Sequence, residues 1–363
     1  MPSVGVREVY HFMSIRCESF GQLPSGEAVS RYTLTNHAGA HVSILNYGGI
    51  IQSLFVPDRN GQLGDVVLGC SCLADYLPNK GNLGALIGRV GNRIGGAAFD
   101  LNGVTYHLYP NDHGNCLHGG QYGFNTKMWR ATPIENGDED MLVLTYESAD
   151  GEENFPGALQ VIVTYTFTDA NELKIRYEAV STKDTLCNLT NHSYFNLRGE
   201  GTGTVLDTEI QLLADAFTPT DEKLIPTGEI RPVEGTLFDL RQPRPISTCV
   251  EHMAEDPQLM AGQGYDHNFV INGTGMRKFA EAYDPTSGRV MTCHTDMNCT
   301  QFYTGNMLGG MTGKCGREYG LREGFCLETQ FAPDSIHHPN FPDSVLRAGE
   351  KYDYTTIFAC AAR

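Results

Sequence analysis

The chain of 363 residues is long enough for two average domains or for one large all-β domain. Its 26 Lys and Arg residues against 43 Asp and Glu residues give a net charge of -17. This charge repels nucleic-acid phosphates and anionic lipid headgroups, so we expect neither nucleic acid nor a membrane as a partner.

The first fifteen residues, MPSVGVREVYHFMSI, lack the basic segment and apolar core that a signal peptide needs. No apolar run approaches the roughly 18 residues of a membrane span. The 11 cysteines are an odd number and are scattered singly apart from Cys70 and Cys72, so we expect reduced thiols. Together these features predict a soluble, cytoplasmic protein.

Short alternating runs between clusters of Gly, Pro, Asn and Asp predict strands along the whole chain. In the first half we expect strands at residues 31–36, 41–49, 50–58, 65–70 and 141–148. The clearest pattern is a hairpin of residues 161–168 and 173–180, in which apolar residues alternate with threonines or charges. This alternation predicts a hairpin with one buried face.

Residues 188–201, NLTNHSYFNLRGEG, predict a further strand that runs into a Gly-rich loop. Written as a strand, one of its faces is polar with a single aromatic and carries Asn188, Thr190, His192, Tyr194 and Asn196. For an isolated strand, a solvated exterior face would be the simpler interpretation. The purpose of His192 therefore depends on the rest of the chain.

In the second half we expect strands at residues 208–214, 267–273, 288–295, 299–305 and 325–333. Only residues 71–77 and 247–257 have a briefly helical pattern, and 41 Gly and 17 Pro suit a chain that turns often. We therefore predict an all-β fold, a large antiparallel β-sandwich with two or more sheets packed face to face. Since no repeat or linker is apparent, we expect a single domain over residues 1–363.

Several common site motifs are missing. The glycines of GRVGNRIGG and GEGTGTV do not lie between a strand and a helix, as phosphate binding requires. No histidine or cysteine pair has the spacing of a zinc site, and no Gly-x-Ser-x-Gly nucleophile motif occurs. We therefore expect neither a metal nor a nucleotide cofactor.

Six short segments are instead rich in polar residues: GRVGNRIGG, NDHGNCLHGG, NLTNHSYFNL, GYDHNFVI, CTQFYTGN and GFCLETQFAPD. They supply Arg93, His118, His192, Asp266, Gln301 and Glu328, a mixture of donors and acceptors that suits a ring of hydroxyl groups. The aromatic residues that could stack on a sugar are Tyr194, Phe302, Tyr303 and Phe331. Together the segments predict a polar, sugar-binding concavity on a sheet.

These six motifs, in this order, resemble the aldose 1-epimerases, also called galactose mutarotases. The resemblance runs from residue 43 to about residue 352 and so covers most of the chain. It implies a β-supersandwich of the galactose mutarotase type and no required cofactor. It also implies an isomerase that interconverts the α and β anomers of free hexoses such as D-galactose and D-glucose.

Carried over by position, the resemblance implies that His192 is the general acid and Glu328 the general base. It implies that the substrate-binding residues are Asn92, Arg93, His118, Asp266 and Gln301, although His118 or Asp266 could orient a neighbour instead. Opening a hemiacetal requires one base at the C1 hydroxyl and one acid at the ring oxygen, and a carboxylate and an imidazole suit these roles near neutral pH. We interpret His113, His267, His337 and His338 as structural.

Two other functions remain open. A hexose-6-phosphate epimerase should gather several cations around its site, but the motif segments offer mainly Arg93, with Arg89 nearby. A sugar-binding protein without catalysis would not need both His192 and Glu328. The expected partner is a monosaccharide, bound by a monomer or a weak dimer, and the preferred aldose is not indicated because epimers differ by one hydroxyl group.

Overall fold

The computed structural model describes residues 14–77, 81–135 and 139–363. Residues 1–13, which hold most of the segment in which no signal peptide is expected, lie outside the described residues. Antiparallel sheets dominate the fold, the largest with nine strands and two more with five strands each. Within the described ranges, no helix has the length and apolar character needed to cross a membrane.

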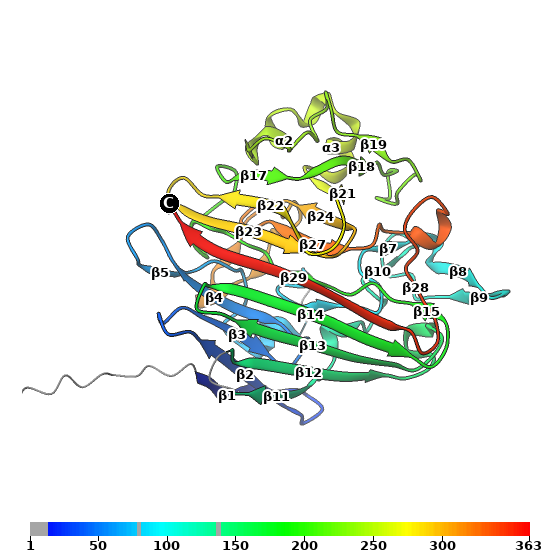
Figure 1. The fold of residues 1–363 in the computed structure, drawn as a ribbon, viewed down its shortest axis with the longest axis horizontal. Helices are drawn as coiled ribbons and strands as arrows, with labels where there is room; N and C mark the ends of the chain where they lie inside the picture. Colours follow the sequence, from blue (N-terminus) through cyan, green and yellow to red (C-terminus); the bar gives the residue numbers. More distant parts are fainter. Residues whose placement is uncertain (1–13, 78–80, 136–138) are drawn as a thin grey trace, which may run out of the picture.

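The nine-stranded sheet forms one broad face of the molecule, with its long strands side by side (Figure 1). In spatial order its strands are β11 (Arg130–Ile134), β12 (Met141–Ser148), β13 (Leu159–Phe167), β14 (Glu172–Ser181), β29 (Lys351–Ala362), β23 (Arg289–Thr295), β22 (Arg277–Tyr283), β17 (Glu209–Leu212) and β20 (Arg244–Pro245). The predicted hairpin is confirmed as β13 and β14, where Val163 pairs with Tyr177 and both are buried. Its alternation gives the sheet one apolar face.

The two five-stranded sheets supply the other apolar faces. One contains β1 (Ser14–Gln22), β2 (Ala28–Thr35), β3 (His41–Leu45), β4 (Ile51–Pro57) and β5 (Leu63–Asp65). The other contains β19 (Arg231–Pro232), β18 (Ala214–Thr218), β21 (Asp266–Ile271), β24 (Cys299–Tyr303) and β27 (Cys326–Gln330). Val42, Val163 and Phe269, one from each sheet, belong to one continuous apolar core. The predicted antiparallel β-sandwich is therefore confirmed.

Short pairs and helices complete the fold. The two-residue strands β6 (Leu86–Ile87) and β16 (Thr190–Asn191) pair, as do β7 (Arg93–Ile94) and β10 (Cys116–Leu117). The remaining pairs are β8 (Ala98–Leu101) with β9 (Val104–His107), β15 (Thr185–Leu186) with β28 (Val345–Leu346), and β25 (Met311–Thr312) with β26 (Glu318–Tyr319). The helices are α1 (Leu73–Tyr76), α2 (Ser247–Glu251) and α3 (Pro257–Gly262), and α3 extends beyond the expected helical segment.

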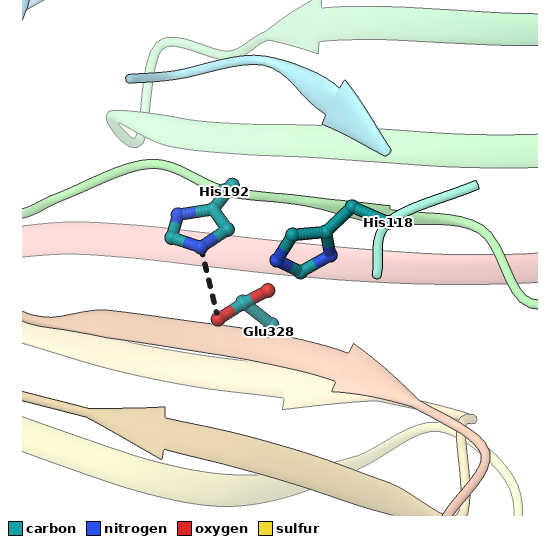
Figure 2. A group of neighbouring side chains, drawn as sticks. All are labelled: His118, His192 and Glu328. Carbon is teal, nitrogen blue, oxygen red and sulfur yellow. Dashed lines mark ion pairs between the residues drawn. The ribbon is translucent and has the colours of Figure 1, made fainter. Parts of the chain in front are cut away.

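The strand expected at the start of residues 188–201 is wrong. Its only regular strand is the two-residue β16, and His192 lies just after β16, outside any strand (Figure 2). The amides of this segment bond to different neighbours in turn: His192 N–H to the carbonyl of Ala85, and Asn196 N–H to that of Val66. Changing partners in this way prevents one continuous ladder. The face that could have been solvated is buried, since His192 is only 5% exposed.

The strand expected over residues 65–70 is also wrong, since only its first residue belongs to a strand. Strand β5 ends at Asp65, and Val67 makes only an isolated bridge to Phe195. Both segments therefore pack against each other as irregular extended chain. This irregular chain carries His192 in the interior, between the regular sheets.

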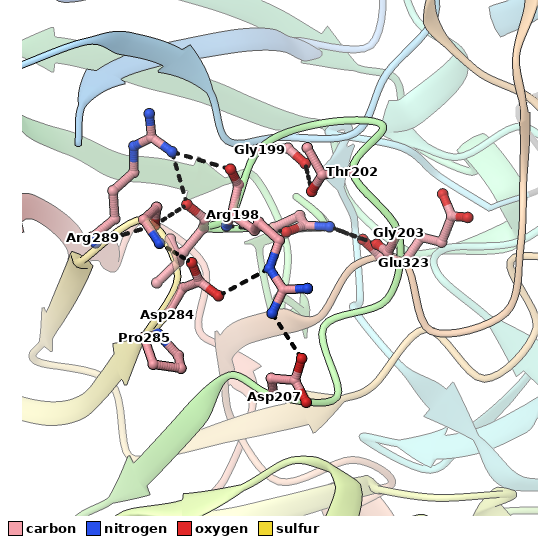
Figure 3. A network of polar contacts seen from close by, with 12 residues as sticks. Arg198, Gly199, Thr202, Gly203, Asp207, Asp284, Pro285, Arg289 and Glu323 are labelled. Carbon is pink, nitrogen blue, oxygen red and sulfur yellow. Dashed lines mark hydrogen bonds and ion pairs between the residues drawn. The ribbon is translucent and has the colours of Figure 1, made fainter. Parts of the chain in front are cut away.

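A buried arginine fixes the end of this irregular chain (Figure 3). The Arg289 guanidinium donates hydrogen bonds to the carbonyls of Val56, Leu197, Arg198 and Gln62 at 3.0–3.2 Å. One charged side chain thus satisfies carbonyl groups of two segments far apart in sequence. Buried carbonyl groups without a partner would destabilise the fold.

We predict that Arg289→Ala lowers the free energy of unfolding by about 3 kcal/mol, because the hydrogen bonds of one buried guanidinium to four carbonyl groups are lost together. Urea unfolding followed by circular dichroism measures the change. Arg16→Ala is the control, since the exposed Arg16 side chain pairs with Glu18 alone among the described residues, and it should change stability by less than about 0.5 kcal/mol. A loss at Arg289 no larger than at Arg16 would contradict this account.

Candidate active site

A cavity opens beside the five-stranded sheet that contains β21, β24 and β27. Its volume of about 340 Å³ is within the size range of ligand sites. The structure brings all seven sequence-predicted site residues to its lining, namely Asn92, Arg93, His118, His192, Asp266, Gln301 and Glu328. They come from three neighbouring strands and from the connections around β7, β10 and β16. The polar segments of the sequence therefore converge on one place.

Sheet register positions the carboxylates. On β24 and β27, Gln301 lies directly opposite Glu328, and Asp266 at the start of β21 lies opposite Tyr303. The Gln301 side-chain amide donates a 2.7 Å hydrogen bond to Oδ1 of Asp266. Opposed residues of an antiparallel pair stand side by side, so Gln301 lies beside Glu328. Asp266 is two residues from the β21 partner of Gln301 and is therefore its diagonal neighbour.

Glu328 and His192 form the centre of the site (Figure 2). His192 Nε2 lies 3.6 Å from Oε1 of Glu328, and both side chains are buried. Burial raises the pKa of Glu328 well above its ordinary value, with the nearby Asp266 charge adding to this effect and Arg93 opposing it. Burial also lowers the pKa of His192 to about 4. The empty site therefore disfavours the charged form of each group.

The second oxygen of Glu328 has no partner. Oε2 is buried and makes no hydrogen bond within the described residues. Figure 2 shows this oxygen turned toward the ring of His118. An orphaned buried oxygen of this kind is unfavourable in the empty protein and needs an explanation. A ligand hydroxyl that donates to Oε2 would remove the penalty.

Backbone geometry holds His118 in one tautomer. Asn92 and His118 both have positive φ, at 61° and 53°, and exchange two hydrogen bonds: His118 N–H donates to the carbonyl of Asn92, and Asn92 N–H donates to Nδ1 of His118. Nδ1 is an acceptor here, so the neutral ring carries its proton on Nε2. Burial and the nearby His192 and Arg93 charges hold the pKa of His118 well below its ordinary value. His118 is therefore a neutral donor.

A glycine explains the motif that follows His118. A side chain at Gly119 would place its Cβ 2.0 Å from the carbonyl oxygen of Gly88. Only glycine permits this approach, and its φ of 88° also favours glycine. The LHGG segment thus packs tightly enough to hold His118 against Asn92.

Ligand atoms of His118, His192 and Glu328 all lie within 4.8 Å of one another, a spacing that could suit a metal ion. The donor chemistry fits poorly. A metal ligand nitrogen must be unprotonated, yet the bond from Asn92 leaves the proton of His118 on Nε2. This trio is better suited to binding a polar organic ligand.

The charge of Arg93 is already paired. Its Nε lies 2.7 Å from Oδ2 of Asp112, and both side chains are largely buried. The lining carries four carboxylate residues against two cationic ones, Arg93 and Lys223; the four are Asp112, Glu222, Asp266 and Glu328. The site is therefore not an anion receptor of the kind that a phosphate requires.

The sequence interpretation missed part of the lining and misplaced two aromatics. Asp112 and His113 line the cavity, as do Leu224 and Met307, although His113 was expected to be structural. Asp112 lies within the quoted polar segment NDHGNCLHGG, so its carboxylate was a usable signal. Of the aromatics expected to stack on a sugar, Tyr194 and Tyr303 line the cavity, whereas Phe302 and Phe331 belong to the apolar core.

Comparisons with known proteins agree with one another. The family model described as aldose 1-epimerase matches residues 30–359. A galactose mutarotase of Rattus norvegicus is 44% identical over 349 residues, covering 95% of this chain and 98% of the relative. An aldose 1-epimerase of Escherichia coli is 36% identical, covering 92% and 96%. The solved structure of a galactose 1-epimerase from Lactobacillus acidophilus is 26% identical with a TM-score of 0.85, covering 96% and 99%.

We predict that Glu328→Gln stabilises the protein at pH 8 by about 1–2 kcal/mol, because it removes a carboxylate that burial disfavours. The pKa of Glu328 is raised on folding, so wild-type stability falls as pH rises through the folded pKa. The advantage of the variant should therefore shrink toward pH 4, where the carboxyl group stays protonated even when unfolded. Urea unfolding at both pH values tests this, with the exposed strand residue Glu147, as Glu147→Gln, for control. A pH-independent difference would contradict it.

Proposed function

The chain belongs to the aldose 1-epimerase family and interconverts the anomers of hexoses, and we propose that Glu328 is the base and His192 the acid of this reaction. The observation that supports the assignment is the buried pair itself. Nε2 of His192 lies 3.6 Å from Oε1 of Glu328, while Oε2 of Glu328 lacks a partner. A base and an acid held this closely can act on the two oxygens of one hemiacetal carbon.

In the proposed mechanism, Glu328 removes the proton of the C1 hydroxyl through Oε2. The C1–O1 bond gains double-bond character while the bond between C1 and the ring oxygen breaks. The ring oxygen takes the Nε2 proton of His192 and becomes a hydroxyl group. Rotation about C1–C2 presents the other face of the aldehyde, and reversal of the proton transfers closes the ring as the other anomer.

The pair needs one shared proton. Because burial raises the pKa of Glu328 and lowers that of His192, the proton resides on Glu328 in the empty site. A bound sugar favours the reactive arrangement, since its C1 hydroxyl donates to the carboxylate and its ring oxygen accepts from the imidazolium. The limbs of a bell-shaped pH profile of kcat/KM then belong to the pair rather than to either residue.

The other lining residues would hold the sugar hydroxyl groups. Arg93 and the Nε2–H group of His118 are donors, and Asp266 is an acceptor whose other hydrogen bond comes from Gln301. Asn92 lines the cavity and also holds His118 in place. In this proposal each of the five predicted binding residues either contacts a sugar hydroxyl group or orients another residue that contacts one.

Charge supports free hexoses, such as D-galactose and D-glucose, over hexose phosphates. Arg93 is paired with Asp112, and carboxylates outnumber cations around the cavity. A phosphate dianion would enter against this balance. A non-catalytic sugar receptor would not need a histidine and a carboxyl group held together at one point, so the pair of His192 and Glu328 weakens the binding-protein alternative.

We also propose a cytoplasmic location, which is supported by eleven cysteines that are all free. The partner is a monosaccharide, the protein a monomer or a weak dimer, and residues 1–363 a single domain. The family match over residues 30–359 supports the last of these. Light scattering measures the oligomeric state.

We predict that Glu328→Gln lowers kcat by on the order of 10²–10⁴ while sugar binding is retained, because the amide keeps the shape but cannot accept a proton. His192→Asn should lose a similar factor, and the double variant much less than the product of both, since the two groups serve one step. Polarimetry of fresh α-D-glucose and α-D-galactose measures kcat. Retention of more than a third of wild-type kcat by Glu328→Gln would make the assignment wrong.

We predict that dialysis against a strong chelator leaves kcat unchanged, because His118 presents a protonated nitrogen to the site. Polarimetry before and after dialysis provides the measurement. Loss of activity that a divalent cation restores would overturn the proposed metal independence.

A further inference from the structure

One strand supplies partners for both ring nitrogens of His192. Cys326 and Glu328 are two residues apart on β27, so their side chains leave the same face. Sγ of Cys326 lies 3.5 Å from Nδ1 of His192, and Oε1 of Glu328 lies 3.6 Å from Nε2. The imidazole is therefore bracketed by a thiol and a carboxylate.

We propose that Cys326 is a positioning residue that accepts a hydrogen bond from Nδ1–H of His192 and so reserves Nε2 for proton exchange with the sugar. This inference rests on the proposed role of His192 as the acid. When one ring nitrogen is held as a donor, the other becomes the nitrogen that gains and loses protons. Nε2 is the nitrogen that faces Glu328 and the cavity.

The other groups around the ring leave this task to Cys326. The rings of Tyr194, Tyr303 and His118 face His192 at centroid distances of 4.9, 6.2 and 5.2 Å. Across the described ranges, the Cys326 thiol makes the only side-chain hydrogen bond to Nδ1. Burial lowers the pKa of His192 and a hydrogen bond with its own backbone opposes this effect, and the sulfur contact adds a side-chain partner that further favours the acid form.

The backbone fixes the distance between the two side chains. Phe195, three residues after His192, and Phe325, directly before Cys326, exchange backbone hydrogen bonds of 2.7 and 3.0 Å. A side chain at Gly324 would place its Cβ 2.9 Å from Cβ of Tyr194, so glycine permits this close approach. The contact between Cys326 and His192 is therefore part of a rigid junction.

A thiol suits this position chemically. Burial raises the pKa of Cys326 well above its ordinary value, and the Glu328 and Asp266 charges add to this effect, so the sulfur stays neutral at working pH. A neutral sulfur is a weak acceptor, which orients the ring and raises its proton affinity less than a charged acceptor would. A carboxylate in the same place would bind the imidazolium tightly and make Nε2–H a weaker acid. Cys326 thus combines orientation with acid strength.

The test compares Cys326→Ala, Cys326→Ser and wild type by polarimetry of α-D-galactose. We expect Cys326→Ala to lower kcat by roughly 3- to 10-fold, with KM changed by less than about twofold, because only the acid loses a partner. The acidic limb of the kcat/KM profile, where the pair takes its second proton, should move to lower pH. Cys326→Ser restores an acceptor and should recover much of kcat and of the limb position.

The matched control is Cys299→Ala, which removes a buried thiol from the adjacent strand β24 in a separate apolar cluster. It should leave kcat and both limbs unchanged. If Cys326→Ala leaves kcat and the pH limbs unchanged while His192→Asn loses most of its kcat, the role of Cys326 is wrong but that of His192 stands. A fully active His192→Asn variant would instead overturn the proposed role of His192 as the acid.

A measurement on the wild-type protein avoids dependence on the variants. Nitrogen-15 NMR of labelled histidine, assigned with His192→Asn, reports which ring nitrogen carries the proton. We expect Nδ1 of His192 to be protonated throughout the working pH range. An unprotonated Nδ1 in the neutral ring would mean that the thiol donates rather than accepts, and the proposal would be wrong.

Discussion

Desolvation of the Glu328 and His192 pair is the constraint on which the site depends. Two groups that would be charged in water are held 3.6 Å apart in the interior, and burial disfavours the charged form of each. Burial separates the pair from bulk solvent, so the hydroxyl groups of a sugar become the natural partners. Oε2 of Glu328, which has no hydrogen-bond partner among the described residues, shows the same effect. It lowers the stability of the empty protein and remains available to a ligand hydroxyl group.

Glu328 and His192 need rigid surroundings, because small shifts of the neighbouring chain would let the two side chains leave this unfavourable arrangement. The register of β24 and β27 sets Glu328 opposite Gln301, and Gln301 in turn binds Asp266. His192 lies on irregular chain, yet this chain is held on both sides of it, by the pairing of β16 with β6 before it and by the bridge of Phe195 to Phe325 after it. Regular sheets thus position Glu328, and a network of tertiary hydrogen bonds positions His192.

Charge around the cavity then limits what can bind. Arg93 could attract an anion, but its pairing with Asp112 occupies that charge and turns the remaining guanidinium donors into a fixed hydrogen-bonding surface. Neutral His118 adds another donor without adding charge. A neutral, hydroxyl-rich ring meets donors and acceptors alike in this setting, whereas a phosphorylated sugar would also meet the surplus of carboxylates.

The sequence by itself determined the β-sandwich through side-chain alternation, and its ordered polar motifs, with the family that they resemble, named the seven residues that line the cavity. The tertiary structure decided that residues 188–201 form buried irregular chain, that Asp112 pairs with Arg93, and that Cys326 contacts a histidine 134 residues away. It also decided that the pKa of Glu328 is raised and that of His192 lowered, since these shifts follow from burial and neighbours. A local pattern states which face a residue occupies, but distances and desolvation arise only when remote segments pack together.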